Sequence, residues 1–155
     1  MLVVARRLDG RIIKGHTTDF HPNRERFSVT MSPGAEPIDV LTDGLKAVFF
    51  VRSLDGNPDR RDHRMFPNAS GQARPKIWLE FKDGERMAGW TVSVPLGRDG
   101  FYVIPTDPAS NVEKAYVYRD AVSVLLQGEE AVVAAWTERD DRKKADRASA
   151  VFRVL

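Results

Sequence analysis

The chain has 155 residues, of which 42% are hydrophobic and 30% charged, a composition typical of a folded globular protein and not of a disordered one. Its 24 Lys and Arg residues against 22 Asp and Glu residues give a net charge of +2, which neither requires nor excludes a nucleic acid partner. The absence of cysteine excludes disulfides and thiol chemistry. No apolar run approaches the roughly 20 residues that a membrane-spanning helix needs, and residues 1–7 lack the pattern of a signal peptide. We therefore expect a cytoplasmic protein without a membrane partner.

Residues 1–54 predict a first unit of five short strands. Asp9-Gly10 is a tight hairpin turn, and Gly15 lies near the middle of the second strand, where a strand that bends sharply needs a glycine. The expected strands cover residues 2–8, 11–20, 26–31, 38–41 and 45–51. The last of these is continuously apolar except for Lys46, so we expect it to be the most deeply buried.

Phe49 and Phe50 are adjacent on this fifth strand. Successive side chains of a strand point to opposite faces, so one phenylalanine must lie in the core of the first unit. The other then packs between two units or is exposed. The pair is the best indication in the sequence that the units pack on each other or on a partner.

Residues 55–76 predict a linker. Asp55-Gly56-Asn57-Pro58 is a strong turn signal, and a run of mixed charges follows it. About 20 residues without periodicity is long for a compact domain. Met65-Phe66-Pro67 is the part of the linker that can pin back onto a strand unit.

Residues 77–127 repeat the plan of the first unit. The stretch from Asp9 to Thr17 returns from Asp83 to Thr91, 74 residues later (83 − 9 = 74), and the offset holds without a gap well beyond the motif. Phe27, for example, falls on Phe101. Repeats of this kind indicate two copies of one structural unit.

Residues 128–155 predict a C-terminal helix and tail. Gly128 is followed by good helix formers, with Glu129 and Glu130 in the first turn. The apolar end, Val151 to Leu155, is expected to dock on a strand unit, with binding of a partner as the alternative.

The stretch from Leu8 to Gly15 resembles the first motif of Sm-like (Lsm/Hfq-type) small barrels, in which an Asp-Gly turn precedes a strand with a bending glycine; the stretch from Lys82 to Gly89 resembles it too. The resemblance implies an all-β (mostly) fold of two tandem five-stranded Sm/SH3-like barrels, packed side by side, with a C-terminal α-helix. Sm-like proteins bind RNA through an Asp…Asn loop and a basic-glycine pair. Asp19 and Asn23 give a loosely spaced version of the loop, whereas Leu45-Lys46 and Arg119-Asp120 replace the pair.

A second resemblance is to bacterial barrel domains found beside PilZ modules, the receptors of cyclic di-GMP. Residues 45–52 with 55–58, and residues 101–108 with Asn111, are similar to those domains. PilZ receptors use an Arg-x-x-x-Arg pair and, some twenty or more residues on, an Asp/Asn-x-Ser-x-x-Gly. Here Arg60 and Arg64 are followed after only four residues by Asn68-Ala69-Ser70, and the final glycine is Ala73.

Motifs of catalysis are absent: there is no phosphate-binding loop and no nucleophile elbow. His16, His21 and His63 lack the spacing of metal ligands. We therefore expect no enzyme activity, no cofactor and no metal.

Two surfaces are candidates for binding. A basic face would contact phosphates or nucleic acid, with affinity falling as salt rises, and aromatic side chains would form a patch for a protein partner. The basic face would contain Arg11, Lys14, Arg24 and Arg26. The protein-interaction patch would contain Phe49, Phe50, Trp90, Tyr102 and Tyr118.

The sequence therefore favours a non-catalytic binding or adaptor module for protein–protein contact in bacterial cytoplasmic signalling. Two alternatives stay open. One is Sm-like binding of RNA or another nucleic acid. The other is a PilZ-like receptor in which Arg60 and Arg64 contact cyclic di-GMP. Self-association also stays open.

Overall fold

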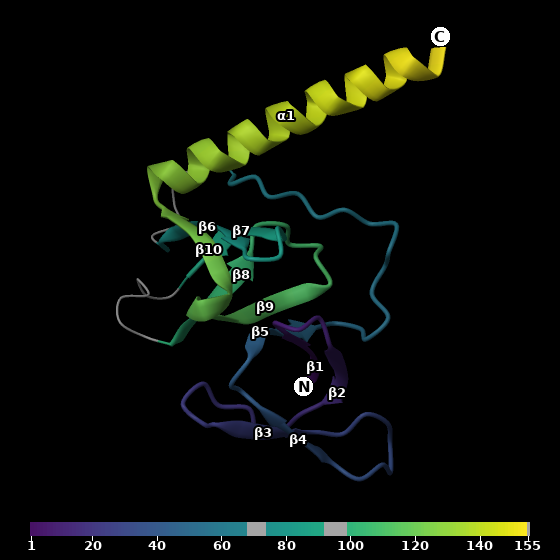
Figure 1. Ribbon diagram of the computed structural model, residues 1–155, viewed down its shortest axis with the longest axis vertical. Helices are drawn as coiled ribbons and strands as arrows, with labels where there is room; N and C mark the ends of the chain where they lie inside the picture. Colours follow the sequence, from purple (N-terminus) through teal and green to yellow (C-terminus); the bar gives the residue numbers. More distant parts are fainter. Residues whose placement is uncertain (68–73, 92–98, 155) are drawn as a thin grey trace.

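The computed structural model describes residues 1–67, 74–91 and 99–154, with side chains up to residue 147. In this part the protein is mostly β, with one C-terminal helix (Figure 1). The first repeat contains β1 (Leu2–Arg7), β2 (Ile12–His16), β3 (Arg26–Val29), β4 (Ile38–Leu41) and β5 (Leu45–Val51). The second contains β6 (Lys76–Phe81), β7 (Arg86–Trp90), β8 (Gly100–Pro105), β9 (Val112–Tyr118), a 3-10 turn (Arg119–Ala121) and β10 (Val122–Gln127). The helix α1 (Glu129–Val154) follows.

The predicted offset is confirmed for the first two strands of each repeat, whereas the fifth strands correspond at 77 residues, because Val3 opposite Phe50 matches Ile77 opposite Gln127 (127 − 50 = 77). Adding 74 to the bounds of β1 gives those of β6 (2 + 74 = 76, 7 + 74 = 81), and adding 74 to those of β2 gives those of β7 (12 + 74 = 86, 16 + 74 = 90). The hairpin glycines also correspond, because Gly10 has a φ of 91° and Gly84 a φ of 89°. The two halves of the chain therefore fold by the same local rules.

Both repeats place their strands in the same order. In the second repeat the order is β10-β6-β7-β8-β9, which is fifth, first, second, third and fourth. In the first repeat β5, β1 and β2 are neighbours, and one bridge between His16 and Thr30 leads from β2 to the separate β3-β4 sheet. Among the described strands, backbone pairing closes neither repeat into a barrel. The predicted pair of separate closed barrels is thus replaced by an eight-stranded antiparallel sheet and a two-stranded one.

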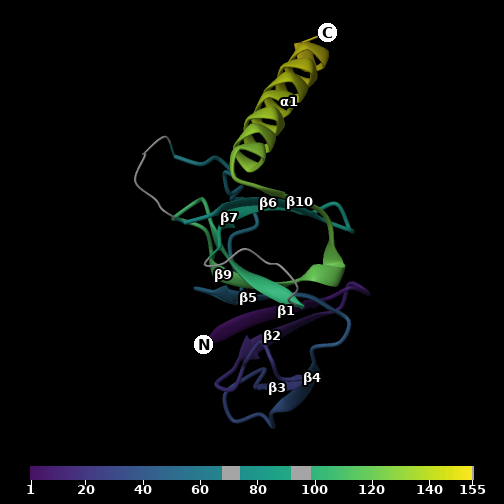
Figure 2. The ribbon, with the colours of Figure 1, turned by 90° about the vertical axis from the view of Figure 1, so that its left-hand side faces the viewer.

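The two repeats are joined through their strands. β9, the fourth strand of the second repeat, pairs antiparallel with β5, the fifth strand of the first, with Ala47 opposite Val117 and Phe49 opposite Ala115. This pairing makes one sheet run through both repeats, as Figure 2 shows from the side. The repeats are therefore fused at a strand boundary and do not merely touch.

β5 is buried on both faces, as its apolar sequence predicts. All seven of its residues are buried. Phe50 belongs to the core of the first repeat, with Phe27 and Val48, whereas Phe49 belongs to the core of the second repeat, with Phe81. The prediction from the Phe49-Phe50 pair is confirmed, and the strand is shared by two hydrophobic cores.

The one charged residue of β5 is paired across the repeats. The side chain of Lys46 is only 5% exposed, and its Nζ donates a hydrogen bond to Asp83 at 2.6 Å and another to Glu85. The same Nζ lies 4.4 Å from the centre of the Phe81 ring. The ion pairs satisfy a charge that burial alone would strongly disfavour.

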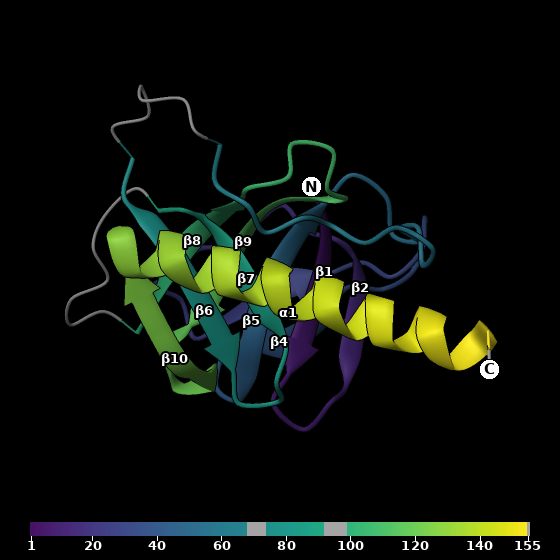
Figure 3. The same ribbon diagram turned by 90° about the horizontal axis from the view of Figure 1, so that it is seen from above.

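The connector and the helix cover the outer side of the second repeat. Phe66 is buried with Trp78, Trp90, Ala131 and Ala135, which confirms that the Met65–Pro67 stretch folds back onto a strand unit. Helix α1 begins at the predicted residue and extends well past the sheet (Figures 1 and 3). The side chains of the predicted docking segment 151–155 lie outside the described residues. Within the described chain, no helix combines the length and the apolarity needed to cross a membrane.

Candidate functional site

A groove of about 1440 Å³ runs between the two repeats. Its first-repeat wall comes from residues 21–25, which precede β3, and from the turn between β4 and β5. Its second-repeat wall comes from the start of β8 and the end of β9, and it contains Tyr102, Tyr116 and Tyr118. The groove thus exists because β9 pairs with β5, which brings these segments together from distant parts of the sequence.

The tyrosines of the groove form a ladder of edge-on contacts. The ring centres of Tyr102 and Tyr116 are 5.0 Å apart, and those of Tyr116 and Tyr118 are 5.2 Å apart. Phe20 of the first repeat stacks edge-on against Tyr116 at 5.9 Å and against Phe50 at 5.5 Å. Such contacts fix the rings in place. Tyr116 is only 6% exposed, so it holds Tyr102 and Tyr118, and these two form the preformed surface.

Tyr118 has an unusual hydroxyl group. Its oxygen is shielded from solvent and has no hydrogen-bond partner among the described residues. Burial raises the pKa of Tyr118, and the neighbouring phenols of Tyr116 and Tyr102 raise it further, so the group is a neutral donor. A buried donor without an acceptor is destabilising unless a ligand accepts its hydrogen bond. Tyr118 lines the groove, but its hydroxyl lies beneath the groove surface, so a ligand would reach it only by displacing the side chains that shield it.

The charged residues that line the groove are mainly acidic. They comprise four carboxylates and two guanidinium groups, with His21 beside them. The acids are Glu25, Asp43, Asp99 and Asp120, and the bases are Arg24 and Arg119. This balance favours a ligand that carries positive charge and disfavours a phosphate backbone.

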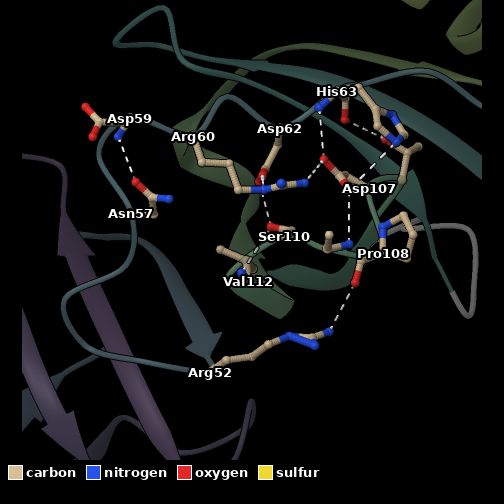
Figure 4. A network of polar contacts seen from close by, with 12 residues as sticks. Arg52, Asn57, Asp59, Arg60, Asp62, His63, Asp107, Pro108, Ser110 and Val112 are labelled. Atoms are coloured by element: carbon tan, nitrogen blue, oxygen red, sulfur yellow. Dashed lines mark hydrogen bonds and ion pairs between the residues drawn. The ribbon is translucent and has the colours of Figure 1, made fainter.

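The two arginines predicted to contact cyclic di-GMP are already engaged in ion pairs. Arg60 donates to Asp107 at 2.7 Å and to Asp62 at 3.3 Å (Figure 4). Arg64 binds Glu138 of α1 through two guanidinium nitrogens. Their contacts tie the connector to the second repeat and to the helix. Asn68 and Ser70 of the same motif lie outside the described residues.

Asp107 is the centre of the network that holds the connector. It accepts hydrogen bonds from Arg60 and from the backbone N–H groups of His63 and Ala109, and its side chain is only 5% exposed. Ser110, three residues later, donates a hydrogen bond to Asp62 at 2.6 Å. The stretch predicted as a linker is therefore anchored to the second repeat over residues 60–66.

Replacement of Asp107 by asparagine is expected to flatten the acid dependence of stability. Burial alone would raise the pKa of Asp107, but the hydrogen bonds from Ala109, His63 and Arg60 and the charge of His63 outweigh it and lower the pKa. A lowered pKa in the folded state stabilises the protein above the unfolded-state value, and this contribution is lost as pH falls through the folded-state value. Urea unfolding of both proteins from about pH 5 down to pH 2 measures this. Parallel curves would contradict it.

The four residues predicted to form a basic face lie in different environments. Arg11 pairs with Asp9 at 3.1 Å, and Lys14 donates to the backbone oxygen of Leu54 at 3.1 Å. Arg26 lies 3.7 Å from Asp39, and Arg24 lines the groove. Three of the four therefore have separate partners, and among the described residues no hydrogen bond or ion pair links the four to one another.

The predicted protein-interaction patch must be corrected in part. Phe49, Phe50 and Trp90 are at most 8% exposed, because they fill the three hydrophobic clusters and cannot form a surface. Tyr102 and Tyr118 line the groove, as a binding role requires. It was not predicted that Tyr116 joins Tyr102 and Tyr118 in one ladder, or that acidic residues lie beside them. The alternation of Tyr116, Val117 and Tyr118 on one strand was the available signal.

The loop proposed for RNA contact does not present a free aspartate. Asp19 accepts hydrogen bonds from the Thr17 hydroxyl at 3.1 Å and from the Ser28 backbone at 2.9 Å. The bond from Ser28 is the main reason that the pKa of Asp19 is lowered. The described residues also contain no cluster of three or more His, Cys, Asp or Glu side chains that would hold a metal ion.

Fold and groove together define a class: a mostly-β protein of two fused repeats with a tyrosine-lined groove between them. A family model described as a family of unknown function, DUF6982, matches residues 2–127, and the chain belongs to this family. The match spans both repeats and ends before α1, so the two repeats are one unit of the family. No curated protein and no solved structure matches the chain.

Proposed function

We propose that this protein is a non-catalytic binding module that recognises a partner protein through the groove between its repeats, as an adaptor in bacterial cytoplasmic signalling. The tyrosine ladder with the unsatisfied Tyr118 hydroxyl is the observation that carries the proposal. Tyrosine offers a large rigid contact area and a polar tip, which suits protein interfaces. The ligand is an extended segment that brings lysine or arginine to the acidic rim and, on displacing the side chains that shield Tyr118, a backbone carbonyl to its hydroxyl.

The proposal includes a finer description of the fold, in which each repeat is an open, barrel-like unit with the strand order of the Sm/SH3 kind. The shared strand order and the bending glycines Gly15 and Gly89 support it. The signalling context follows from the resemblance to PilZ-associated barrels. Nucleic acid and cyclic di-GMP are alternative ligands that the experiment below separates from a protein segment.

A charge reversal in the groove tests the proposal. Glu25→Lys combined with Asp99→Lys is expected to weaken binding of peptides selected from a phage-displayed random library by at least about tenfold. The same change on the helix, Asp140→Lys with Asp146→Lys, is the matched control and is expected to leave binding unchanged. All four carboxylates are on exposed residues, so both variants should fold. Affinity is measured by fluorescence anisotropy on labelled peptides.

The same pair of variants distinguishes the alternatives. Binding of a labelled oligouridylate would rise in the groove variant if nucleic acid were the ligand, because phosphate binding follows positive charge. Binding of cyclic di-GMP that is lost with Arg60→Ala would replace our proposal by the receptor hypothesis. A library that yields no specific peptide, or peptides equally affected by the groove and helix variants, would overturn it.

A further inference from the structure

A second cavity, of about 440 Å³, lies on the outer side of the second repeat, between the connector and α1. It shares no lining residue with the groove between the repeats. One wall comes from the connector and the other from the helix; the lining residues are His63, Arg64, Met65, Glu138, Arg139 and Arg142. The volume is in the range of sites that hold small molecules, roughly 300–1,000 Å³.

One carboxylate holds the two walls of this cavity together. Glu138 accepts hydrogen bonds from Nε and Nη2 of Arg64 and, at 3.4 Å, from the indole N–H of Trp78. Its Oε1 atom also lies 3.5 Å from Arg142 and 4.0 Å from Arg86, and its side chain is only 9% exposed. Three guanidinium groups therefore share a single buried carboxylate, and two of the three line the cavity.

The charges that line the cavity do not balance. Arg64, Arg139 and Arg142 carry three positive charges and Glu138 carries one negative charge, which leaves an excess of +2 (3 − 1 = 2). The carboxylates that follow Arg139 on the helix, at positions 140 and 141, do not line the cavity. Positive groups held close together repel one another, so the cavity favours an anion that neutralises them. Its sign is opposite to that of the acidic groove.

The arginines of the cavity also have hydrogen-bond donors to offer. Within the described part of the chain, neither Arg139 nor Arg142 donates a hydrogen bond: Arg142 has its 3.5 Å ion pair, and the guanidinium of Arg139 stacks on the Trp136 ring at 5.4 Å. Arg64 uses Nε and Nη2 for Glu138 and keeps Nη1. A guanidinium presents five N–H groups in one plane, a geometry that matches the oxygens of a phosphate group.

We propose that this cavity binds a small molecule that carries a phosphate monoester. A monoester has a charge of roughly −1.5 to −2 at pH 7 and three strong acceptor oxygens, so it matches both the excess of positive charge and the excess of donors. A phosphodiester carries a single negative charge and leaves part of the excess uncompensated. The phosphate would accept hydrogen bonds from Arg64 on the connector and from Arg139 and Arg142 on the helix.

The rest of the ligand has an apolar contact in Met65. This side chain lines the cavity and packs, partly buried, against the cluster that contains Phe66 and Trp78. A thioether adapts its shape to an aromatic or aliphatic group. Because Glu138 already ties Arg64 to the helix, the two walls are in place before the ligand arrives, which lowers the cost of ordering them.

Isothermal titration calorimetry with phenyl phosphate and with inorganic phosphate, at constant ionic strength, tests the site. We expect saturable binding of phenyl phosphate by the parent, and weaker binding of inorganic phosphate, which lacks a group to contact Met65. Arg139→Gln combined with Arg142→Gln should weaken binding of phenyl phosphate by at least about tenfold, because charge-assisted hydrogen bonds are lost. Lys143→Gln with Arg147→Gln, which removes the same charge from exposed positions outside the cavity, is the matched control and should bind as the parent does.

Four results would overturn this assignment. The parent could bind neither compound, or it could bind both equally, which would indicate an adventitious ion only. The two double variants could weaken binding alike, which would indicate a diffuse attraction to the basic part of the helix. A phosphoserine peptide could bind more tightly than phenyl phosphate, which would assign the cavity to a phosphorylated protein. The groove variant, Glu25→Lys with Asp99→Lys, should bind phenyl phosphate as the parent does, so the test is independent of the peptide experiment.

Discussion

Replacement of Gly89 by alanine is expected to destabilise the protein by about 3 kcal/mol or more. A Cβ atom at this position would collide with the backbone carbonyl of Ile104 on β8 and would lie 2.8 Å from the Val103 side chain. Backbone cannot move aside as a flexible side chain does, so β7 and β8 must separate. Gly15 meets the backbone of Thr30 in the same way, and 30 + 74 = 104, so Gly15→Ala should have a similar effect. Thermal and urea unfolding measure both.

Gly84→Ala is the matched control for this prediction. Gly84 belongs to the same repeat, but a Cβ there would meet no atom within 4 Å. Its φ of 89° makes alanine unfavourable by only about 1–2 kcal/mol. If Gly84→Ala proved as damaging as Gly89→Ala, backbone conformation and not the close approach of the strands would explain the glycine in each repeat.

The second large effect is expected where Lys46 meets its carboxylates. Asp83→Asn combined with Glu85→Gln should lower the free energy of unfolding by about 2–3 kcal/mol, because it leaves a buried ammonium group without a counter-charge. Lys46→Met should be milder, since the two carboxylates left behind are 55% and 43% exposed and water can solvate them. Chemical denaturation of the three proteins gives the comparison.

The informative comparison is between the loss of stability in Lys46→Met and the loss in the double carboxamide variant. Lys82→Met, which removes an exposed lysine next to Asp83, is the control for loss of a positive charge at the same turn. It should change stability by less than about 0.5 kcal/mol. A Lys46→Met variant that is less stable than the double carboxamide variant would show that the lysine stem, and not the buried charge, stabilises the junction.

Local features of the fold could be predicted from the sequence. The Asp-Gly turns, the strand alternation and the 74-residue offset fix the two repeats, because hairpin and bend chemistry act over a few residues. Phe49-Phe50 predicted that one ring lies in the core of the first repeat, since a period of two sends adjacent side chains to opposite faces, and left open whether the other packs between the repeats or is exposed. The start of α1 followed from its glycine and its first-turn acids.

Contacts between distant segments could not be predicted. Nothing in the composition of β5 or β9 says that they pair, because strand edges are chemically alike and the choice depends on three-dimensional shape. For the same reason the partners of Lys46, which lie 37 and 39 residues away, were not foreseen. The acidic groove was not foreseen either, because it forms only where the pairing of β5 with β9 brings the two repeats together. The basic face stays a prediction, because strand alternation gives the side of the sheet and not the neighbours across it.

A strand shared by two cores has a consequence for how such a protein can change over generations. A substitution in β5 is constrained by the packing of both repeats, since Val48 and Phe50 pack into one core while Ala47 and Phe49 pack into the other. Deletion of the second repeat would expose one face of β5 to water, and deletion of the first would remove β5 and uncover the core that it shares with the second. A duplication fused in this way cannot revert to a single copy by losing half of the gene, and we expect the two halves to be inherited together.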